Sequence, residues 1–392
     1  MIVSLAAETN RLHTETMFNI DNLFLLFIFL ILIAATGIQL FYYLRYYLPV
    51  ALFEPTETST EKPPVSIIIC ARNEAENLDS FLPMVLTQDY PDYEVIVVND
   101  CSADNTYNVL GKYLVEYPHL KVSSINKDPK FTHNKKLAQL IGIKAARNEL
   151  LLFTDADCKP ESNMWLATVA SRFTDKTVFV LGYGGYLCGK GLLNAYIRYD
   201  CITIAMQYLG MAIKGQPYMG VGRNLAYRRS AFFENKGYGV HYQLVSGDDD
   251  LFVNGNATAG NTAVEFRPCA HTRSVPAVTL SDFFKQKRRH LTTARYYKQN
   301  DRAMLLAEPA SRTVFYASLA VLLINGFMWP YALACFGLRL CIQSTVLILV
   351  CKKLNEHKIV AASLFFDIIS PLINLIFYTF KYSRRTGAMK WK

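Results

Sequence analysis

Residues 150–158 read LLLFTDADC, an apolar run that ends in two aspartates, Asp155 and Asp157. The positions from 150 to 153 are all apolar, which is typical of a strand buried on both faces of a parallel sheet. The stretch therefore predicts a buried strand with two carboxylates directly after its carboxyl end. An Asp-x-Asp pair is usually a solvated turn, so its role depends on the chain around it.

The chain before this stretch alternates between strand and helix patterns. A linker ends in Pro63-Pro64, whose extended backbone leads into the first strand. The expected strands are 65–70, 93–98, 120–125 and 150–154, and the expected helices between them are 74–87, 104–116 and 135–147. This alternation predicts an α/β fold with a doubly wound, mostly parallel sheet that binds ligands beyond the carboxyl ends of its strands.

Long apolar runs lie at both ends of the chain. Residues 23–41 carry no charge, and at about 1.5 Å per residue this length approaches the roughly 30 Å thickness of a bilayer core. The run predicts one membrane span, with a secretory signal peptide as the alternative because small residues follow it. Near the other end, 313–330 and 331–351 predict two more spans, and 359–380 is a third apolar segment.

The net charge of +9 comes partly from basic clusters at 352–358 and 381–392, which are typical of the cytoplasmic side of a membrane. No basic-aromatic RNA motif is present, so nucleic acid is not an expected partner. The nine cysteines show no CxxC spacing, which favours a reducing compartment. We expect a multi-pass protein of the cell (inner) membrane with a cytoplasmic α/β domain. Asp367 and Pro371 predict a re-entrant or interfacial hairpin that keeps the basic tail inside.

Polar residues also follow the first two expected strands. Ala71, Arg72, Asn73 and Glu74 come after the first strand and can offer backbone NH groups and a cation to a nucleotide, or they can cap the next helix. Asp100 ends the second strand, where its carboxylate can accept the imide NH of a uracil ring or cap the following helix.

The two aspartates of the opening stretch can supply hard oxygen ligands to Mg²⁺ or Mn²⁺ beside a diphosphate. Together, the three motifs resemble the family 2 glycosyltransferases in order and spacing, over residues 65 to about 297. The resemblance implies a GT-A-like fold and a nucleotide-sugar donor, with a UDP-sugar expected. It also implies that Asp100 contacts the base, that Asp157 binds the metal, and that Asp155 lies against the ribose or diphosphate.

Two adjacent lysines, Lys135 and Lys136, stand where this family places a lysine that contacts the donor. We choose Lys136 as the donor contact. A charge on the helix surface is the alternative for both.

Residues 246–254 read SGDDDLFVN and resemble the Gly-Asp-Asp segment that carries the general base in membrane-integrated members of the family. Alignment of Gly247 and Asn254 places the base at Asp249, with Asp248 as second choice. A carboxylate near a metal-bound phosphate suits this role, because apolar surroundings and neighbouring acids raise its proton affinity. A calcium-binding turn is the alternative, although the twelve-residue ligand spacing is absent.

Residues 286–290 read QKRRH and resemble the Gln-x-x-Arg-Trp motif of membrane-bound synthases of the cellulose, hyaluronan and poly-N-acetylglucosamine type. The resemblance implies that Arg289 meets the donor diphosphate with Gln286 nearby. His290 replaces a tryptophan that stacks on the acceptor sugar in the family, which argues against a processive sugar channel. A basic amphipathic helix lying on the membrane is a further interpretation.

The segment 220–229 resembles the glycine segment on the acceptor side of the family's site. Glycines at such positions let the backbone approach a sugar closely. Gly222, Asn224 and His290 are therefore the expected acceptor residues. Ordinary loop glycines are the alternative.

Taken together, the motifs predict an inverting, metal-dependent glycosyltransferase of hexosyltransferase type. It would move a sugar from a nucleotide-sugar to a hydroxyl of a glycan or lipid-linked acceptor. Transfer to a polyprenyl phosphate, processive polysaccharide synthesis and a nucleotide-binding scaffold without turnover are the alternatives. The expected parts of the chain are an N-terminal transmembrane anchor (1–48), a linker (49–64), a catalytic domain (65–280), an amphipathic interface helix (281–300) and a C-terminal membrane region (311–392).

Overall fold

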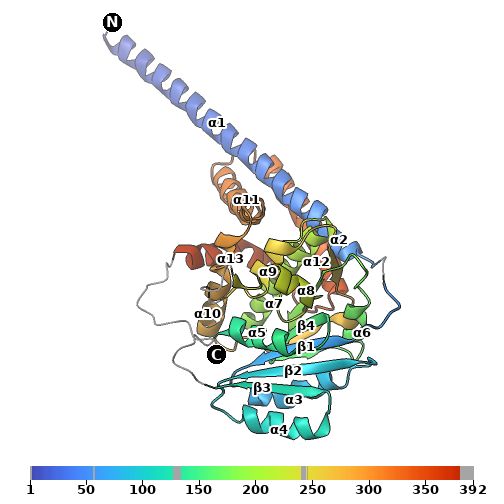
Figure 1. Ribbon diagram of the computed structural model, residues 1–392. Helices are drawn as coiled ribbons and strands as arrows, with labels where there is room; N and C mark the ends of the chain where they lie inside the picture. Colours follow the sequence, from blue (N-terminus) through green and yellow to red (C-terminus); the bar gives the residue numbers. More distant parts are fainter. Residues whose placement is uncertain (1, 56–57, 127–133, 240–243, 245, 380–392) are drawn as a thin grey trace.

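The computed structural model describes residues 2–55, 58–126, 134–239, 244 and 246–379 (Figure 1). A seven-stranded sheet with the order β3-β2-β1-β4-β8-β6-β9 forms the centre of the α/β domain. Its strands are β1 (Val65–Ala71), β2 (Tyr93–Asp100), β3 (Leu120–Ile125), β4 (Leu150–Asp155), β6 (Phe179–Gly182), β8 (Leu225–Arg228) and β9 (Thr262–Glu265). The strands from β3 to β4 are mutually parallel, β8 runs antiparallel to both β4 and β6, and β6 is parallel to β9.

The four strands and three helices expected from the first half of the sequence are all present. The helices are α3 (Ala75–Leu86), α4 (Thr106–Glu116) and α5 (Lys135–Ala145). Ile67 and Ile69 of β1 pack with α3 and α4, whereas Ile68 packs with α5 on the opposite face. A Cβ on Gly142 of α5 would lie 2.6 Å from Ile68 Cγ2, so this glycine permits the close helix-to-strand contact. The prediction of a mostly parallel sheet covered on both faces is confirmed.

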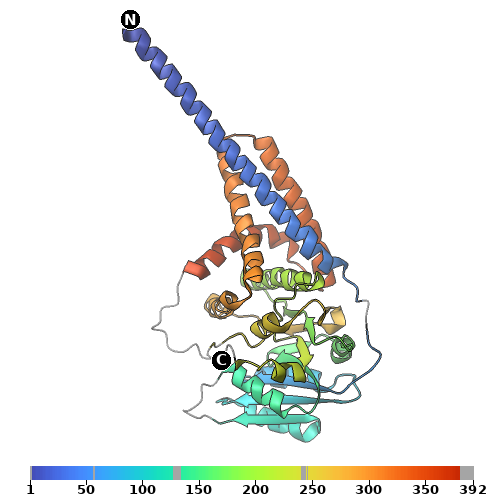
Figure 2. The same cartoon turned by 45° about the horizontal axis from the view of Figure 1, so that its top comes forward.

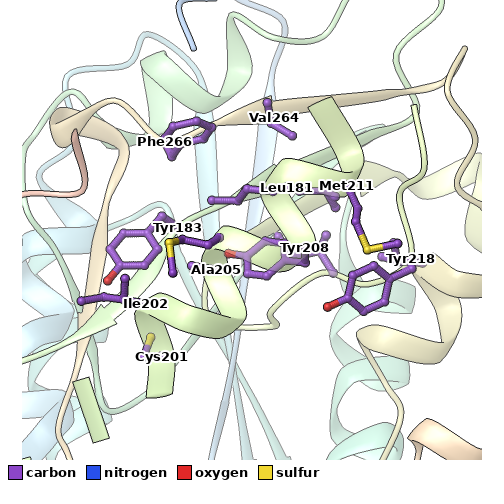
Figure 3. Close-up of a cluster of buried hydrophobic side chains, with 14 of the residues drawn as sticks. Leu181, Tyr183, Cys201, Ile202, Ala205, Tyr208, Met211, Tyr218, Val264 and Phe266 are labelled. Carbon is purple, nitrogen blue, oxygen red and sulfur yellow. The ribbon is translucent and has the colours of Figure 1, made fainter. Parts of the chain in front are cut away.

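The second half of the domain adds a three-stranded sheet with the order β5-β10-β7. These strands and the helices around them are β5 (Cys158–Pro160), β7 (Gly184–Tyr186), β10 (Thr272–Ser274), α6 (Trp165–Ala170), α7 (Leu192–Ile213), α8 (Arg229–Glu234), α9 (Asp250–Asn256) and the 3₁₀ turn η3 (Pro268–Ala270). Figure 3 shows Ile202, Ala205 and Tyr208 of α7 packed near Leu181 and Tyr183. The long helix α7 thus supports the strands next to the small sheet.

The remaining helices lie outside the sheet. They are α1 (Ile2–Tyr42), a π-helical turn η1 (Tyr43–Tyr47), α2 (Leu48–Leu52), α10 (Leu280–Leu291), the 3₁₀ turn η4 (Ala294–Tyr296), α11 (Gln299–Ile324), α12 (Trp329–Lys353) and α13 (Val360–Thr379). α1 packs along α11 and α12, and these helices rise together from one side of the domain (Figure 2). Among the described residues, Asn22–Leu52 and Trp329–Lys353 are long and apolar enough to cross a membrane, and Val360–Asn374 is a shorter apolar helix.

A buried polar network fixes α13 against this helix bundle. Asp367 accepts hydrogen bonds from Arg312 at 3.1 Å, from Arg339 at 2.8 Å and from Tyr316 at 2.6 Å. Arg339 also donates to Gln39 of α1 at 3.0 Å. Because a buried charge is stable only when it is paired, these contacts hold α13 across the base of α11 and α12 (Figure 2). The basic tail, which entered the topology prediction, lies outside the described residues.

Candidate active site

The acidic pair, Asp155 and Asp157, lies at the carboxyl end of β4. Ligand atoms of Asp155, Asp157 and Cys158 all lie within 4.8 Å of one another. Burial raises the pKa of Asp157, and the neighbouring charge of Asp155 raises it further. Burial also raises the pKa of the Cys158 thiol well above its ordinary value, and sulfur is a soft donor that suits a hard cation less well than carboxylate oxygen does. The two carboxylates fit Mg²⁺ or Mn²⁺, because a cation would relieve their mutual repulsion.

Lys135 connects this pair to the second acidic segment. Its Nζ lies 2.7 Å from Asp155 Oδ1 and 3.5 Å from Asp248 Oδ2. Burial alone would raise the pKa of Asp155, but the Lys135 ammonium holds the pKa below its usual value. Lys136, which we expected to contact the donor, is instead 1% exposed, and burial lowers its pKa. Lys135 is the lysine that reaches the acidic residues.

Asp249 lies at the amino end of α9, and both of its carboxylate oxygens accept hydrogen bonds from backbone NH groups. Its Oδ2 accepts a hydrogen bond from the backbone of Gly222 at 2.6 Å, and its Oδ1 accepts one from the backbone of Asp250 at 2.8 Å. Burial, followed by the charges of Asp248 and Asp250, raises the pKa of Asp249 to about 7. A carboxylate with this pKa can take and release a proton near neutral pH.

Asp250, the third consecutive acid, is engaged by its own chain. Its Oδ2 accepts hydrogen bonds from Thr293 Oγ1 at 2.5 Å and from Tyr297 OH at 2.7 Å, and its Oδ1 accepts one from the backbone of Leu251. These contacts join α9 to the turn after α10. Asp250 therefore fixes the register of the segment and leaves Asp248 and Asp249 to face the site.

The first two motifs meet at the carboxyl ends of the neighbouring strands β1 and β2. Arg72 Nη1 lies 3.6 Å from Asp100 Oδ2, and Asp100 is fully buried. Asn73 has φ of 54° and its side chain accepts a hydrogen bond from the backbone of the loop after β2 at 2.7 Å. The Glu74 backbone donates to Thr106 Oγ1 at 3.1 Å. Ala71 is the fully buried last residue of β1, so only its backbone could meet a ligand.

The helix α10 carries the Gln-x-x-Arg residues toward the same region. Gln286 Nε2 donates to Tyr186 OH at 3.3 Å. Arg289 is half-buried, and its charge contributes to the lowered pKa of Asp155. His290 is exposed, with its Nε2 3.4 Å from Arg289 Nη2.

Arg223 and Tyr186 were missed by the sequence reasoning. Arg223 donates to Tyr186 OH at 3.0 Å and to the Gly184 carbonyl at 2.7 Å, and its guanidinium lies over the Tyr186 ring. Tyr186 thus links Arg223 to Gln286. The only signal in the sequence was the position of Arg223 beside Gly222.

Asn224, expected on the acceptor side, instead ties three segments of the domain together. Its amide nitrogen donates to the carbonyls of Tyr183 and Ala270, each at 2.8 Å, and its oxygen accepts from Trp165 Nε1 at 3.1 Å. The side chain is 1% exposed. A buried amide with these partners has no donor left for an acceptor sugar, so Asn224 supports the site without lining it.

Known proteins resemble this chain in both sequence and fold. Glycosyltransferase AglE of Haloferax volcanii is 33% identical over 143 residues, which are 36% of this chain and 45% of that protein. A poly-beta-1,6-N-acetyl-D-glucosamine synthase of Staphylococcus epidermidis is 31% identical over 93 residues, which are 24% of this chain and 21% of that protein. The chain therefore matches less than half the length of these curated relatives.

A solved structure shares the fold at low sequence identity. Mannosyltransferase PcManGT from Pyrobaculum calidifontis, in complex with GDP-Man and Mn²⁺, superimposes with a TM-score of 0.57 at 20% identity. The match covers 88% of this chain and 99% of that one. The GT-A-like fold expected from the sequence is thus confirmed.

The profile of glycosyl transferase family 21 matches residues 26–392. The glycosyltransferase prediction is confirmed, and the family that matches is family 21, whereas the motifs had pointed to family 2. Since the match spans most of the sequence, this chain is an enzyme that belongs to glycosyl transferase family 21.

Proposed function

We propose that the enzyme is an inverting glycosyltransferase that moves a sugar from a nucleotide-sugar, expected to be a UDP-sugar, to a hydroxyl of a glycan or glycolipid. The observation that supports this most strongly is the position of Lys135. Its ammonium contacts Asp155 of the first acidic motif and Asp248 of the second. The two motifs therefore share one site, where one can serve the donor and the other the acceptor.

In this proposal, residues at the strand ends bind the donor. Asp100 and the segment 71–74 contact the nucleoside, and Asp155 with Lys135 contacts the ribose or diphosphate. Asp157 and Asp155 would hold Mg²⁺ or Mn²⁺, which neutralises charge on the leaving diphosphate when it is bound. Arg289 adds a fixed positive charge on the same side, with Gln286 beside it.

Asp249 removes the proton from the acceptor hydroxyl as that oxygen attacks the anomeric carbon. Its pKa of about 7 keeps it available as a base near neutral pH. The Gly222 backbone orients the carboxylate, and Asp248, held near Lys135, is the second choice for the base. His290 is exposed beside Arg289 and is the proposed contact for the acceptor.

The alternatives differ in what they require of Asp249. A polyprenyl phosphate acceptor is already an anion and needs no base, so the environment of Asp249 favours a hydroxyl acceptor. In the processive synthases that this motif resembles, a tryptophan stacks on the acceptor sugar, and His290 replaces that indole with a smaller, more polar ring.

A donor screen tests the proposal. Detergent-purified enzyme is incubated with UDP- and GDP-sugars, Mn²⁺ or Mg²⁺, and either a hydroxyl or a polyprenyl phosphate acceptor, and the products are identified by mass. We expect metal-dependent transfer to the hydroxyl. Transfer to the lipid phosphate alone would contradict the assigned base.

The pKa of Asp249 predicts how activity depends on pH. Because the base must be ionised and its pKa is raised to about 7, activity should be full above that pH and lost below it. We expect kcat/KM for the acceptor to fall about tenfold for each pH unit below the midpoint. A flat profile between pH 5 and 8, measured where the enzyme remains folded, would contradict the role of Asp249.

We also propose that the chain spans the cell membrane several times and carries its α/β domain in the cytoplasm. Support comes from the two long apolar helices and from α11, which packs beside them. α13 lies across the base of this bundle, as a re-entrant or interfacial segment would (Figure 2). Reporter fusions after Lys353 and Lys392 should both report the cytoplasm, and an external signal after Lys392 would contradict this topology.

A further inference from the structure

The loop between α12 and α13 carries a buried acid among exposed basic residues. Glu356 is 4% exposed, whereas the neighbouring Lys352 and Lys358 are exposed. The Glu356 backbone donates to the Cys351 carbonyl at 2.8 Å, which closes the end of α12. The side chain enters the α/β domain, so a loop that joins two apolar helices makes direct contact with the domain interior.

Two arginines and a tyrosine surround the Glu356 carboxylate. Arg198 of α7 donates to Glu356 Oε2 from Nε at 3.0 Å and from Nη2 at 2.5 Å. Tyr183 OH donates to Glu356 Oε1 at 2.8 Å, and Arg273 Nη1 donates to the same oxygen. The loop carbonyls add further acceptors, since Arg273 donates to Leu354 at 3.0 Å and to Asn355 at 3.1 Å.

Arg273 is the central residue of the small sheet that borders the active site. Its strand β10 pairs with β5, which begins directly after Asp157, and the backbone after β10 donates to the Asp157 carbonyl at 3.1 Å. On its other side β10 pairs with β7, which ends at Tyr186, the partner of Gln286. The small sheet therefore has the acidic pair at one edge and the support for α10 at the other.

The packing around Arg273 leaves little room for adjustment. A Cβ on Gly185 of β7 would lie 2.1 Å from Arg273 Nη1 and 3.0 Å from Glu356 Oε1. The guanidinium thus rests directly on the β7 backbone. Without the carboxylate, Arg198 would lose its ion pair, and Arg273 would keep only the longer one to Glu161, 3.6 Å away. Because buried charges need close partners, we expect β10 to shift from its present position.

We propose that Glu356 is a positioning residue that sets the geometry of the metal-binding pair through Arg273 and the small sheet. This inference rests on the proposed function, because it assumes that Asp155 and Asp157 hold a divalent cation. Figure 3 shows the Tyr183 ring beside Ile202 and Ala205 of α7 in the hydrophobic core. The α12–α13 loop would then couple the apolar helices to the catalytic centre.

The test compares Glu356→Gln with Glu54→Gln in the full-length enzyme in detergent. Glu54 accepts from Lys353 at 2.6 Å, near the same end of α12, but it is 79% exposed and does not touch the small sheet. Electron paramagnetic resonance of free Mn²⁺ gives the dissociation constant, and thermal unfolding is recorded in parallel. Glu356 acts on the pair through Arg273 and two strands and does not touch a metal ligand, so we expect Glu356→Gln to weaken Mn²⁺ binding by about three- to tenfold. Glu54→Gln should change it by less than about twofold, as expected for a surface pair.

A lower unfolding temperature with unchanged Mn²⁺ affinity in Glu356→Gln would overturn the proposal, because it would show a purely structural role. If that variant does not fold, Tyr183→Phe decides, since it removes one hydrogen bond to Glu356 and keeps every charge. We expect weaker Mn²⁺ binding in Tyr183→Phe, and unchanged binding would overturn the proposal. Failure of the unmodified enzyme to bind Mn²⁺ is a different result, because it would overturn the proposed metal site itself.

Discussion

Replacing Asp249 by Asn should abolish sugar transfer while leaving donor binding nearly intact. An amide cannot take the acceptor proton, and general base catalysis contributes about 10²- to 10⁴-fold, so we expect kcat to fall about 10³-fold. Donor binding should change by less than about threefold, because Asp249 contacts the Gly222 backbone rather than the acidic pair. Acceptor-dependent product formation and calorimetric titration of the nucleotide measure the two effects separately.

Asp248→Asn is the matched control for this prediction. Asp248 is buried and lies 3.5 Å from Lys135, so its loss should weaken the link between the two acidic motifs without removing the base. We expect a smaller loss of kcat than in Asp249→Asn. If Asp248→Asn were inactive and Asp249→Asn active, the base would be Asp248 and the alignment of the three consecutive acids would be wrong by one position.

Replacing Asp157 by Asn should remove the response of the enzyme to divalent metal. The amide lacks the charge of the carboxylate, and a bound cation typically contributes several kcal/mol of charge stabilisation. A loss of about 3–4 kcal/mol corresponds to a fall in kcat/KM of about 10²- to 10³-fold. Activity measured against Mn²⁺ concentration, with and without a chelator, checks this prediction.

Cys158→Ala provides the control, because Cys158 is the third residue of the cluster that could hold a metal. Its sulfur is a soft donor, whereas Mg²⁺ and Mn²⁺ prefer oxygen ligands, so we do not expect it to bind the ion. We expect the metal dependence of Cys158→Ala to match that of the unmodified enzyme. A variant that has lost its metal response would mean that the sulfur binds the ion.

The sequence was sufficient for the first half of the sheet because three of its four strands, β1, β2 and β4, are largely apolar runs followed by polar turns. Burial on both faces requires such runs, so strands and helices could be predicted nearly to the residue. The small sheet could not be predicted. Its strands, such as Thr272–Ser274, have three residues each, too few to show a period, and depend on contacts with distant segments.

Some residues of the candidate site could also be placed from the sequence, and others could not. Residues that follow a buried strand, such as Asp155, have a fixed relation to the sheet edge and could be placed from the sequence. The choice between Lys135 and Lys136 depends on the rotation of α5, and adjacent positions on a helix point about 100° apart. Asn224 lies within the predicted glycine segment, but its side chain turns into the interior, and no sequence pattern marks that direction.

The burial of Glu356 is a further feature that the amino-acid composition could not predict. The basic cluster at 352–358 predicted the cytoplasmic side of the membrane, but it did not indicate that an acid within it is buried. Its single acid, Glu356, is buried because it supplies counter-charge to two arginines from distant elements, Arg198 and Arg273, the second of which also pairs with Glu161. Only the folded chain brings these residues together.

The stereochemistry of the product shows whether Asp249 acts as a general base. Asp249 as a base implies a single displacement at the anomeric carbon, which inverts its configuration. Proton NMR of the product formed from an α-linked nucleotide-sugar in the presence of Mn²⁺ should show a β-glycosidic linkage. An α-linked product would contradict the account, because direct attack by a hydroxyl activated at Asp249 cannot retain the configuration.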